Sequence, residues 1–372
     1  MLSCVNKNID NGKLNLAVQG FMGEIMGKRL LWVDYAKAVA IILMVLGHAG
    51  LPNTGKASMM VYMFHMPLFF IISGYFDNSQ KLDAKDFFVR NFKTILIPYF
   101  VFNVVSIPFC AVSAYLHPEL YRFTREAVDF IYQPLLGMLI GDDMVAPHSY
   151  MALGALWFLM ALFVVKTLFY GIQKLAVRVN GLYLPLYFAL IAVASVAVFL
   201  CIKNRLSFWS IDSAFMALPF YMLGYLAKKK SLLDVLIKSR YAAFAISAVS
   251  FVYLYFIGLK NGRIDVNASV YGNNILMFYI NAVVGSVMVI LICNLFTKRS
   301  AFLSTIGEYT IVVLGMHGIG LYISKFLLKV CGVQFSADYL FYATFSVLFC
   351  YVCIKIISRY APVIIGKAKV AK

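Results

Sequence analysis

The sequence predicts an all-α protein, a polytopic integral membrane bundle of about ten transmembrane helices with both termini in the cytoplasm. Of the 372 residues, 62% are hydrophobic and only 13% are charged, whereas soluble domains carry about 25% charged residues. The apolar residues form runs of about 20, the length that a helix needs to cross a bilayer. The basic residues gather in the connections between these runs. This distribution accounts for the net charge of +17 as a topology signal.

Ten segments are apolar enough to span a membrane. They cover residues 30–50, 58–76, 94–116, 150–173, 182–202, 211–227, 241–259, 271–297, 302–325 and 339–358. The shorter stretch 125–141 contains Pro134 and two glycines, so we interpret it as an interfacial or re-entrant piece. The predicted domains are a cytoplasmic tail without a signal peptide (1–29), the membrane domain (30–360) and a basic cytoplasmic tail (361–372).

Charge placement supports an even number of spans. With the N-terminus inside, 22 of the 33 lysine and arginine residues fall on the cytoplasmic side and nine on the outer side. This is the bias that membrane proteins show. The segment 211–227 is the weakest of the ten, and its loss would reverse the orientation of everything after it.

The cysteines predict neither a metal site nor redox chemistry. The seven cysteines are scattered, mostly within apolar segments, so we interpret them as small packing residues. Cys350 and Cys353 form a C-x-x-C pair, but inside a predicted span. No cysteine or histidine spacing is typical of zinc. We therefore expect no metal and no permanently bound cofactor, and we expect membrane lipids rather than nucleic acid as partners.

The first span carries three ionisable residues on one face. Asp34 and Lys37 are three residues apart, and Lys37 and His48 are eleven apart, about three helical turns and roughly 16 Å. Charged groups within spans usually face the interior of a bundle. We therefore predict a polar path that runs from the cytoplasmic mouth to the outer side. The alternative is a snorkelling Asp34–Lys37 pair at the helix end and an interfacial His48.

The second span places His65 close to Pro67. Proline donates no hydrogen bond, so the carbonyl of Met63 is freed and the helix should bend there. This arrangement predicts a polar pocket, and the alternative is a packed histidine bonded to that carbonyl. Ser73 and Tyr75 close the span at its cytoplasmic end, and Gly74 between them permits close helix approach.

Further candidates lie along the rest of the chain. Arg90 and Lys93 precede the "LIPYF" stretch that contains Tyr99. Basic residues at the mouth of a bundle either hold a phosphorylated ligand or only set the topology. Trp157 lies in the fourth span, where it packs or anchors. His317 lies in the middle of the ninth span, and an intramembrane histidine is a candidate functional group.

Five blocks then form a pattern: "VDYAKAVAIILMVLGHAG", "FHMPLFFIISGYF", "LIPYF", "LWFL" and "FMALPFYMLGY". In order and spacing they resemble membrane acyltransferase family 3, and the fucose 4-O-acetylase type within it. The resemblance covers about residues 31–360. It implies about ten spans in the bacterial cytoplasmic membrane. It also implies transfer of an acyl group, commonly acetyl, from cytoplasmic acyl-CoA to a hydroxyl of a cell-surface or lipid-linked carbohydrate.

The resemblance also assigns residues to roles. His48 is the implied catalytic histidine, acting with Asp34 and Lys37, either as a general base or as an acyl-accepting nucleophile. Lys37 stands where many members have arginine. The resemblance points to Arg90 and Lys93 for the phosphates of the donor, and we add Lys37 and Tyr99 as donor-binding residues. As substrate-lining residues we expect His65, Ser73, Tyr75, Trp157 and His317.

A proton-coupled transporter of a sugar or glycan precursor is the alternative from another class. Asp34, Lys37 and His65 would suit proton coupling within the membrane. Internal pseudo-symmetry and broken helices would favour this alternative, and the order of the five blocks disfavours it.

Overall fold

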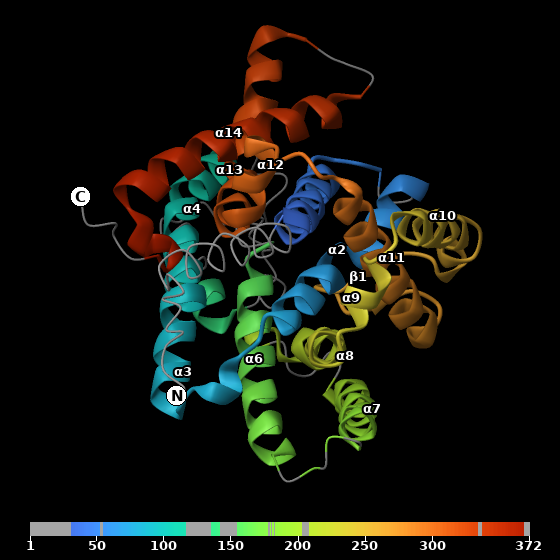
Figure 1. Ribbon diagram of the computed structural model, residues 1–372. Helices are drawn as coiled ribbons and strands as arrows, with labels where there is room; N and C mark the ends of the chain where they lie inside the picture. Colours follow the sequence, from blue (N-terminus) through green and yellow to red (C-terminus); the bar gives the residue numbers. More distant parts are fainter. Residues whose placement is uncertain are drawn as a thin grey trace, which may run out of the picture.

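The computed structural model describes residues 31–52, 55–116, 135–141, 155–177, 179, 181, 183–202, 208–333 and 337–367. Within these ranges, nine helices are long and apolar enough to cross a membrane. The strands in the same ranges make a single two-stranded antiparallel hairpin. The protein is therefore an all-α polytopic helix bundle, as the sequence predicts (Figure 1). The inside and outside assignment of its termini stays a prediction.

The elements follow one another in this order. The first helix is Leu31–His48. It is followed by α2 (Lys56–Tyr75), η1 (Ser79–Lys81), α3 (Ala84–Asn91), the π-helical turn η2 (Phe92–Leu96), α4 (Ile97–Leu116), α6 (Trp157–Ala176), α7 (Leu184–Ile202), η3 (Phe208–Ser210), α8 (Ile211–Lys229), α9 (Leu232–Leu236), α10 (Arg240–Phe256), η4 (Gly258–Asn261), β1 (Ile264–Asp265), β2 (Val270–Tyr271), α11 (Ile275–Leu295), α12 (Ala301–Glu308), α13 (Thr310–Cys331), α14 (Asp338–Tyr360) and η5 (Pro362–Ile365).

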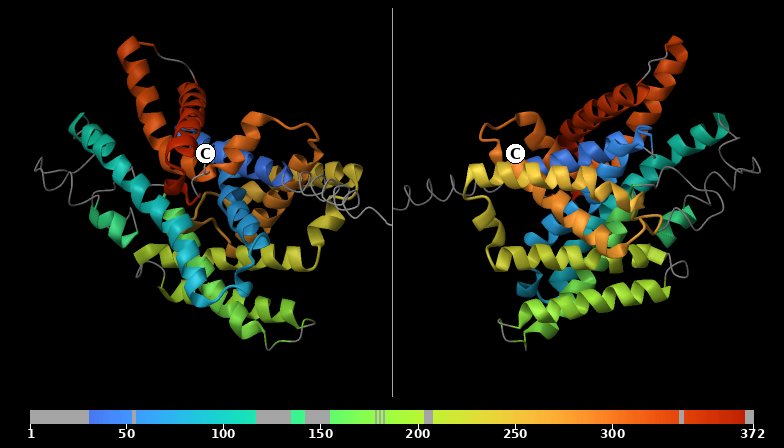
Figure 2. Two further views of the ribbon diagram at one scale, coloured as in Figure 1. Left: turned by 60° about the vertical axis from the view of Figure 1, so that its left-hand side comes forward. Right: turned by 90° about the vertical axis from the view of Figure 1, so that its right-hand side faces the viewer.

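The first helix and α2 form the centre of the bundle. In the most apolar 18-residue stretch of each helix, 56% of the residues are buried in the first helix and 67% in α2. The corresponding share is 17% in α7 and 28% in α10 and α14. The outer helices turn apolar side chains outward, as lipid contact requires. Figure 2 shows α13 and α14 packed side by side, and α10 beside α11.

The first helix and α2 run antiparallel, which defines two ends of the molecule. Trp32, near the start of the first helix, packs edge-on against Tyr75 at the end of α2, with 5.8 Å between ring centroids. At the opposite end, Gly47 lies against Tyr62. The end with the Trp32–Tyr75 contact is called the basic end below, because Lys37 and the helix α3 lie there. The end with the Gly47–Tyr62 contact is called the hairpin end, because β1 and β2 fold over it.

The helices α2 and α8 cross at a pair of glycines. A Cβ on Gly74 would lie 1.9 Å from the carbonyl oxygen of Tyr221, and a Cβ on Gly224 would lie 2.0 Å from that of Ile71. Only glycine permits this distance between the backbones. The sequence-based expectation for Gly74 is thus confirmed.

The helix α8 contacts both the hairpin and the segment that follows α2. Ser213, near its start, donates a hydrogen bond to Val266 of the hairpin (3.0 Å), and Tyr221 donates to Asp77 beyond the end of α2 (2.6 Å). It is not one of the nine candidate spans in the described ranges. The tenth span at 211–227 therefore stays a prediction.

Two predicted spans have other boundaries in the structure. The segment 302–325 is not one helix, because α12 ends at Glu308 and α13 begins at Thr310. The break occurs where Gly307 packs directly on the backbone of Asp34, leaving no room for a side chain. The predicted span 94–116 begins earlier, because α3, η2 and α4 are continuous from Ala84. Residues 125–134 of the predicted re-entrant piece lie outside the described residues.

Candidate functional site

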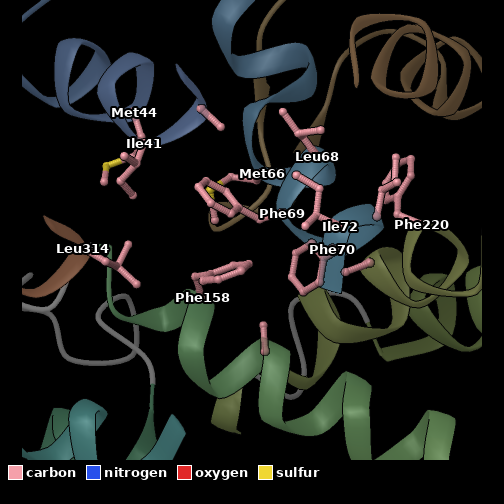
Figure 3. Close-up of a cluster of buried hydrophobic side chains, with 14 of the residues drawn as sticks. Ile41, Met44, Met66, Leu68, Phe69, Phe70, Ile72, Phe158, Phe220 and Leu314 are labelled. Atoms are coloured by element: carbon pink, nitrogen blue, oxygen red, sulfur yellow. The ribbon is translucent and has the colours of Figure 1, made fainter. Parts of the chain in front are cut away.

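A cavity of about 160 Å³ lies among the first helix, α2, η2, α6 and α13. Four of its lining residues are polar, namely Lys37, Ser73, Thr94 and Thr310, and they come from the basic end of their elements. The others are apolar. Figure 3 shows several of these facing one another: Ile41 and Met44 from the first helix, Met66 and Phe69 from α2, Phe158 from α6, and Leu314 from α13. The cavity is thus polar at one end and apolar along its length.

The polar end carries a charge pair. The Lys37 ammonium lies 3.6 Å from the Asp34 carboxylate, and both side chains are about three-quarters buried. Three residues separate them on one helix face, as the sequence predicts. Lys37 lines the cavity and places a positive charge at its polar end, or mouth. The Asp34 carboxylate beside it orients the ammonium group.

The C-terminal segment packs beside this mouth. Lys367 forms an ion pair with Glu308 (2.5 Å) and lies 3.7 Å from the centre of the Tyr309 ring. Gly366 packs against the backbone of Thr94. Burial alone would lower the pKa of Lys367, but the hydrogen bonds to Glu308 and Tyr309 and their charges outweigh it and raise the pKa above its usual value.

The apolar end of the cavity approaches three histidines, each on a different helix. Met44 is one turn from His48, Met66 is next to His65, and Leu314 is three residues from His317. None of the three histidines lines the cavity, which ends about one turn short of them. Methionine is the most adaptable apolar side chain, so Met44 and Met66 form a deformable barrier between the cavity and the histidines.

The histidines differ in their hydrogen bonds. His65 is buried, and its Nδ1 lies 2.9 Å from the carbonyl of Val61. The alternative to a polar pocket was a packed histidine bonded to the carbonyl of Met63, and that partner is wrong, because the imidazole folds back one full turn along its own helix. His317 is buried in the same way, with Nδ1 at 3.0 Å from the carbonyl of Leu314. A carbonyl accepts only, so Nδ1 carries a proton in both rings and Nε2 remains the acceptor.

His48 is the exception. It is the last residue of the first helix and its side chain is exposed. Its ring meets that of His317 edge-on, with 5.3 Å between centroids, and it forms no hydrogen bond within the described part of the chain. Both of its nitrogens are therefore available, which is what a general base or a nucleophile requires.

Besides the histidines, four further predicted site residues lie outside the cavity. Arg90 and Lys93 are exposed at the basic end, where Arg90 donates to Asn78 (3.3 Å). Tyr99 is buried and donates its hydroxyl to the carbonyl of Met138 (2.9 Å). Trp157 is buried against Phe158, with 6.3 Å between ring centroids. Phe158, and not Trp157, lines the cavity.

Tyr75 also lies outside the cavity, although Ser73, two residues before it, lines it. Tyr75 packs on Trp32, and the Lys228 ammonium lies 4.9 Å from the centre of its ring. It therefore joins the first helix, α2 and the end of α8. Its contacts place it in the structure that supports the mouth of the cavity.

Two features of the region were not predicted. Asp77 accepts hydrogen bonds from Tyr221 (2.6 Å) and from the hydroxyl of Ser79 (2.7 Å), which fixes the end of α2. Tyr62 lies between His65 and the hairpin. The sequence could have indicated the role of Asp77, because a carboxylate directly after a span needs hydrogen-bond partners. No local pattern marks Tyr62, since its neighbours come from distant segments.

The cysteines whose side chains the structure describes are free thiols. No group of three or more His, Cys, Asp or Glu side chains that could hold a metal occurs among the described residues. Cys350 is buried and reduced, and Cys353 beside it is also a free thiol. Cys293 is buried as well, whereas Cys201 and Cys331 are exposed.

The fold and this arrangement define a polytopic membrane protein whose internal cavity is polar at one end and stops about one helical turn short of three histidines at the other. The model of the acyltransferase domain of acyltransferase family 3 matches residues 30–355, which is most of the chain. The chain belongs to acyltransferase family 3. Neither the search of curated proteins nor the search of solved structures found a match. Membership of this family favours an acyltransferase over the transporter that the sequence had left open.

Proposed function

We propose that the protein is an O-acyltransferase of the bacterial cytoplasmic membrane. In this proposal it transfers an acetyl group from acetyl-CoA, supplied at the basic end, to a hydroxyl of a carbohydrate at the hairpin end. The observation that supports it most directly is the course of the cavity. It begins at Lys37 and ends one helical turn from His48.

The size and lining of the cavity fit a short acyl thioester. Its 160 Å³ is about ten times or more the roughly 10–15 Å³ that one water molecule needs, enough for a small thioester end. The apolar wall excludes water, which would otherwise hydrolyse the thioester. Arg90 and Lys93 lie outside the cavity on the surface at the same end, where the phosphates of a donor nucleotide would remain in water.

The chemistry would then proceed at His48. As a general base, its free nitrogen takes the proton of the acceptor hydroxyl while that oxygen attacks the thioester carbonyl. The carbon–sulfur bond breaks, and the leaving thiolate takes that proton back from the imidazolium. In the alternative order, the imidazole accepts the acyl group first and passes it to the hydroxyl. Lys37, oriented by Asp34, would hold the donor at the mouth. Ser73 lines the path, and His65 and His317 surround its far end.

Replacement of His48 tests the proposal. His48→Ala should abolish transfer of [¹⁴C]acetyl from acetyl-CoA to surface polysaccharide in isolated membranes, since general-base catalysis alone contributes about 10²–10⁴-fold. Lys37→Met should instead raise the KM for acetyl-CoA, and Lys37→Arg should retain most of the affinity. Expression and elution in detergent should match the wild type. Near-normal transfer by His48→Ala would refute the catalytic assignment.

A further inference from the structure

The hairpin between α10 and α11 is fastened over one end of the central helices. Ser213 of α8 donates to the carbonyl of Val266 (3.0 Å), and the hydroxyl of Ser269 donates to Asp212 (2.8 Å). Both η4 and β1 pack on α2. The hairpin is therefore held by two different helices at the end where His48 and Tyr62 lie.

The hairpin conformation is fixed by its own hydrogen bonds. The side chain of Asn261 is fully buried, donates to the carbonyl of Tyr271 (3.2 Å) and accepts from the amide of Asn274 (2.8 Å). Gly272 has φ +73°, and a Cβ there would lie 2.3 Å from the carbonyl oxygen of Asn261. A loop built in this way holds its exposed side chains in preset positions, as binding sites require.

A small recess lies where the hairpin meets α2. It is lined by Ser58, Met59, Tyr62, Arg263 and Ile264 and has a volume of about 10 Å³. That is room for about one water molecule or one hydroxyl group. Its rim therefore offers a site of the size of a single alcohol oxygen.

Arg263 lines this recess, and Asp265 is paired with it. The Arg263 guanidinium lies 3.0 Å from the Asp265 carboxylate, and their side chains are 56% and 23% exposed. The guanidinium only donates hydrogen bonds and the carboxylate only accepts them. Each hydroxyl of a sugar both donates and accepts hydrogen bonds, so two adjacent sugar hydroxyls match such a pair. The two opposite charges compensate each other, which favours a neutral sugar over an acidic one.

Tyr62 joins the recess to the histidines. Its ring meets that of His65 edge-on, with 5.0 Å between centroids. A Cβ on Gly47, the residue before His48, would lie 3.1 Å from the Tyr62 hydroxyl oxygen. Within the described residues this hydroxyl has no hydrogen-bond partner. A free phenol is thus placed between the recess and the residue that we assign to catalysis.

We propose that Tyr62, Arg263 and Asp265 form the acceptor subsite, which holds the hydroxyls of a neutral sugar beside His48. The inference rests on the proposed function. Asp265 accepts a hydrogen bond from one sugar hydroxyl, and Arg263 donates to its neighbour. Tyr62 is a positioning residue that orients the reacting hydroxyl toward the imidazole.

Kinetics in membranes that contain the full chain test this subsite. The donor is [¹⁴C]acetyl-CoA, and the acceptor is surface polysaccharide isolated from cells lacking the gene. Asp265→Asn should raise the KM for the polysaccharide about tenfold or more, the effect of losing one charged hydrogen bond. Tyr62→Phe should raise it as well. Both variants should keep the wild-type KM for acetyl-CoA, which a variant with a merely disturbed fold would not.

Lys260→Gln is the matched control, because it removes an exposed charge from the same connection without touching the recess. It should leave both KM values unchanged. Wild-type KM for the polysaccharide in both Asp265→Asn and Tyr62→Phe would overturn the subsite and leave the proposed function standing. No transfer by the wild-type protein would overturn the proposed function and the subsite with it.

Discussion

Replacement of Gly74 by alanine tests how closely the central helices must approach. The added Cβ would lie 1.9 Å from the carbonyl oxygen of Tyr221. That oxygen belongs to a helix backbone and cannot rotate away as the end of a side chain does. The two helices must therefore move apart, or α2 must shift along its axis.

The required movement is large on the scale of packing. Ordinary contact begins at about 3.4 Å, so α2 and α8 would have to separate by about 1.5 Å at their crossing. A gap of about 0.5–1 Å already forfeits a quarter to a half of the dispersion energy of each contact. Overpacking of this kind costs typically about 1–3 kcal/mol and occasionally more. We expect about 3 kcal/mol for Gly74→Ala, since backbone meets backbone.

Thermal unfolding of the purified protein in detergent measures this loss. Gly171→Ala is the matched control, because a Cβ there meets no atom within 4 Å and alanine favours a helix by about 1 kcal/mol over glycine. Gly74→Ala should lower the Tm clearly, and Gly171→Ala should keep or raise it. Equal Tm values for Gly74→Ala and the wild type would refute the assigned α2–α8 crossing.

Two further changes have defined outcomes. Tyr221→Phe removes the 2.6 Å hydrogen bond to Asp77 and should lower stability by about 1.5–3 kcal/mol, the range for a bond to a charged group; an unchanged Tm in detergent would contradict this. Lys367→Gln should lower the Tm slightly at neutral pH, by at most about 1 kcal/mol of stability for an exposed pair. Because the pKa of Lys367 in the folded protein lies above its ordinary 10.5, the ion pair with Glu308 stabilises fully below that pH and is lost as pH rises through the folded pKa. The Tm difference between Lys367→Gln and the wild type should therefore disappear at strongly alkaline pH, and its persistence there would contradict the assigned pair.

The sequence was a reliable guide to the spans because lipid imposes one simple requirement. Every backbone polar group must be satisfied within a span, so about 20 apolar residues in a row predict a helix. The break between α12 and α13 escaped this reasoning. Gly307 and Tyr309 are compatible with a continuous helix, and only the contact of Gly307 with Asp34 shows why the chain bends there.

The site was predicted in part. The face shared by Asp34 and Lys37 follows from helical periodicity alone, and the structure pairs them at 3.6 Å. The same periodicity places His48, eleven residues later, on the same face of the helix. It does not reveal that Arg90 stays on the surface, because exposure depends on which helices pack around a side chain.

The sequence by itself determined the class of fold, the positions of most spans and the polar face of the first helix. These follow from interactions between residues close together in the chain. Only the tertiary structure decided that His48 and His317 meet at 5.3 Å, that the cavity ends at Met44 and Met66, and that the hairpin reaches Tyr62. Each of these contacts joins segments separated by many residues along the chain. The packing of helix on helix fixes such distances, and no local pattern in the sequence encodes it.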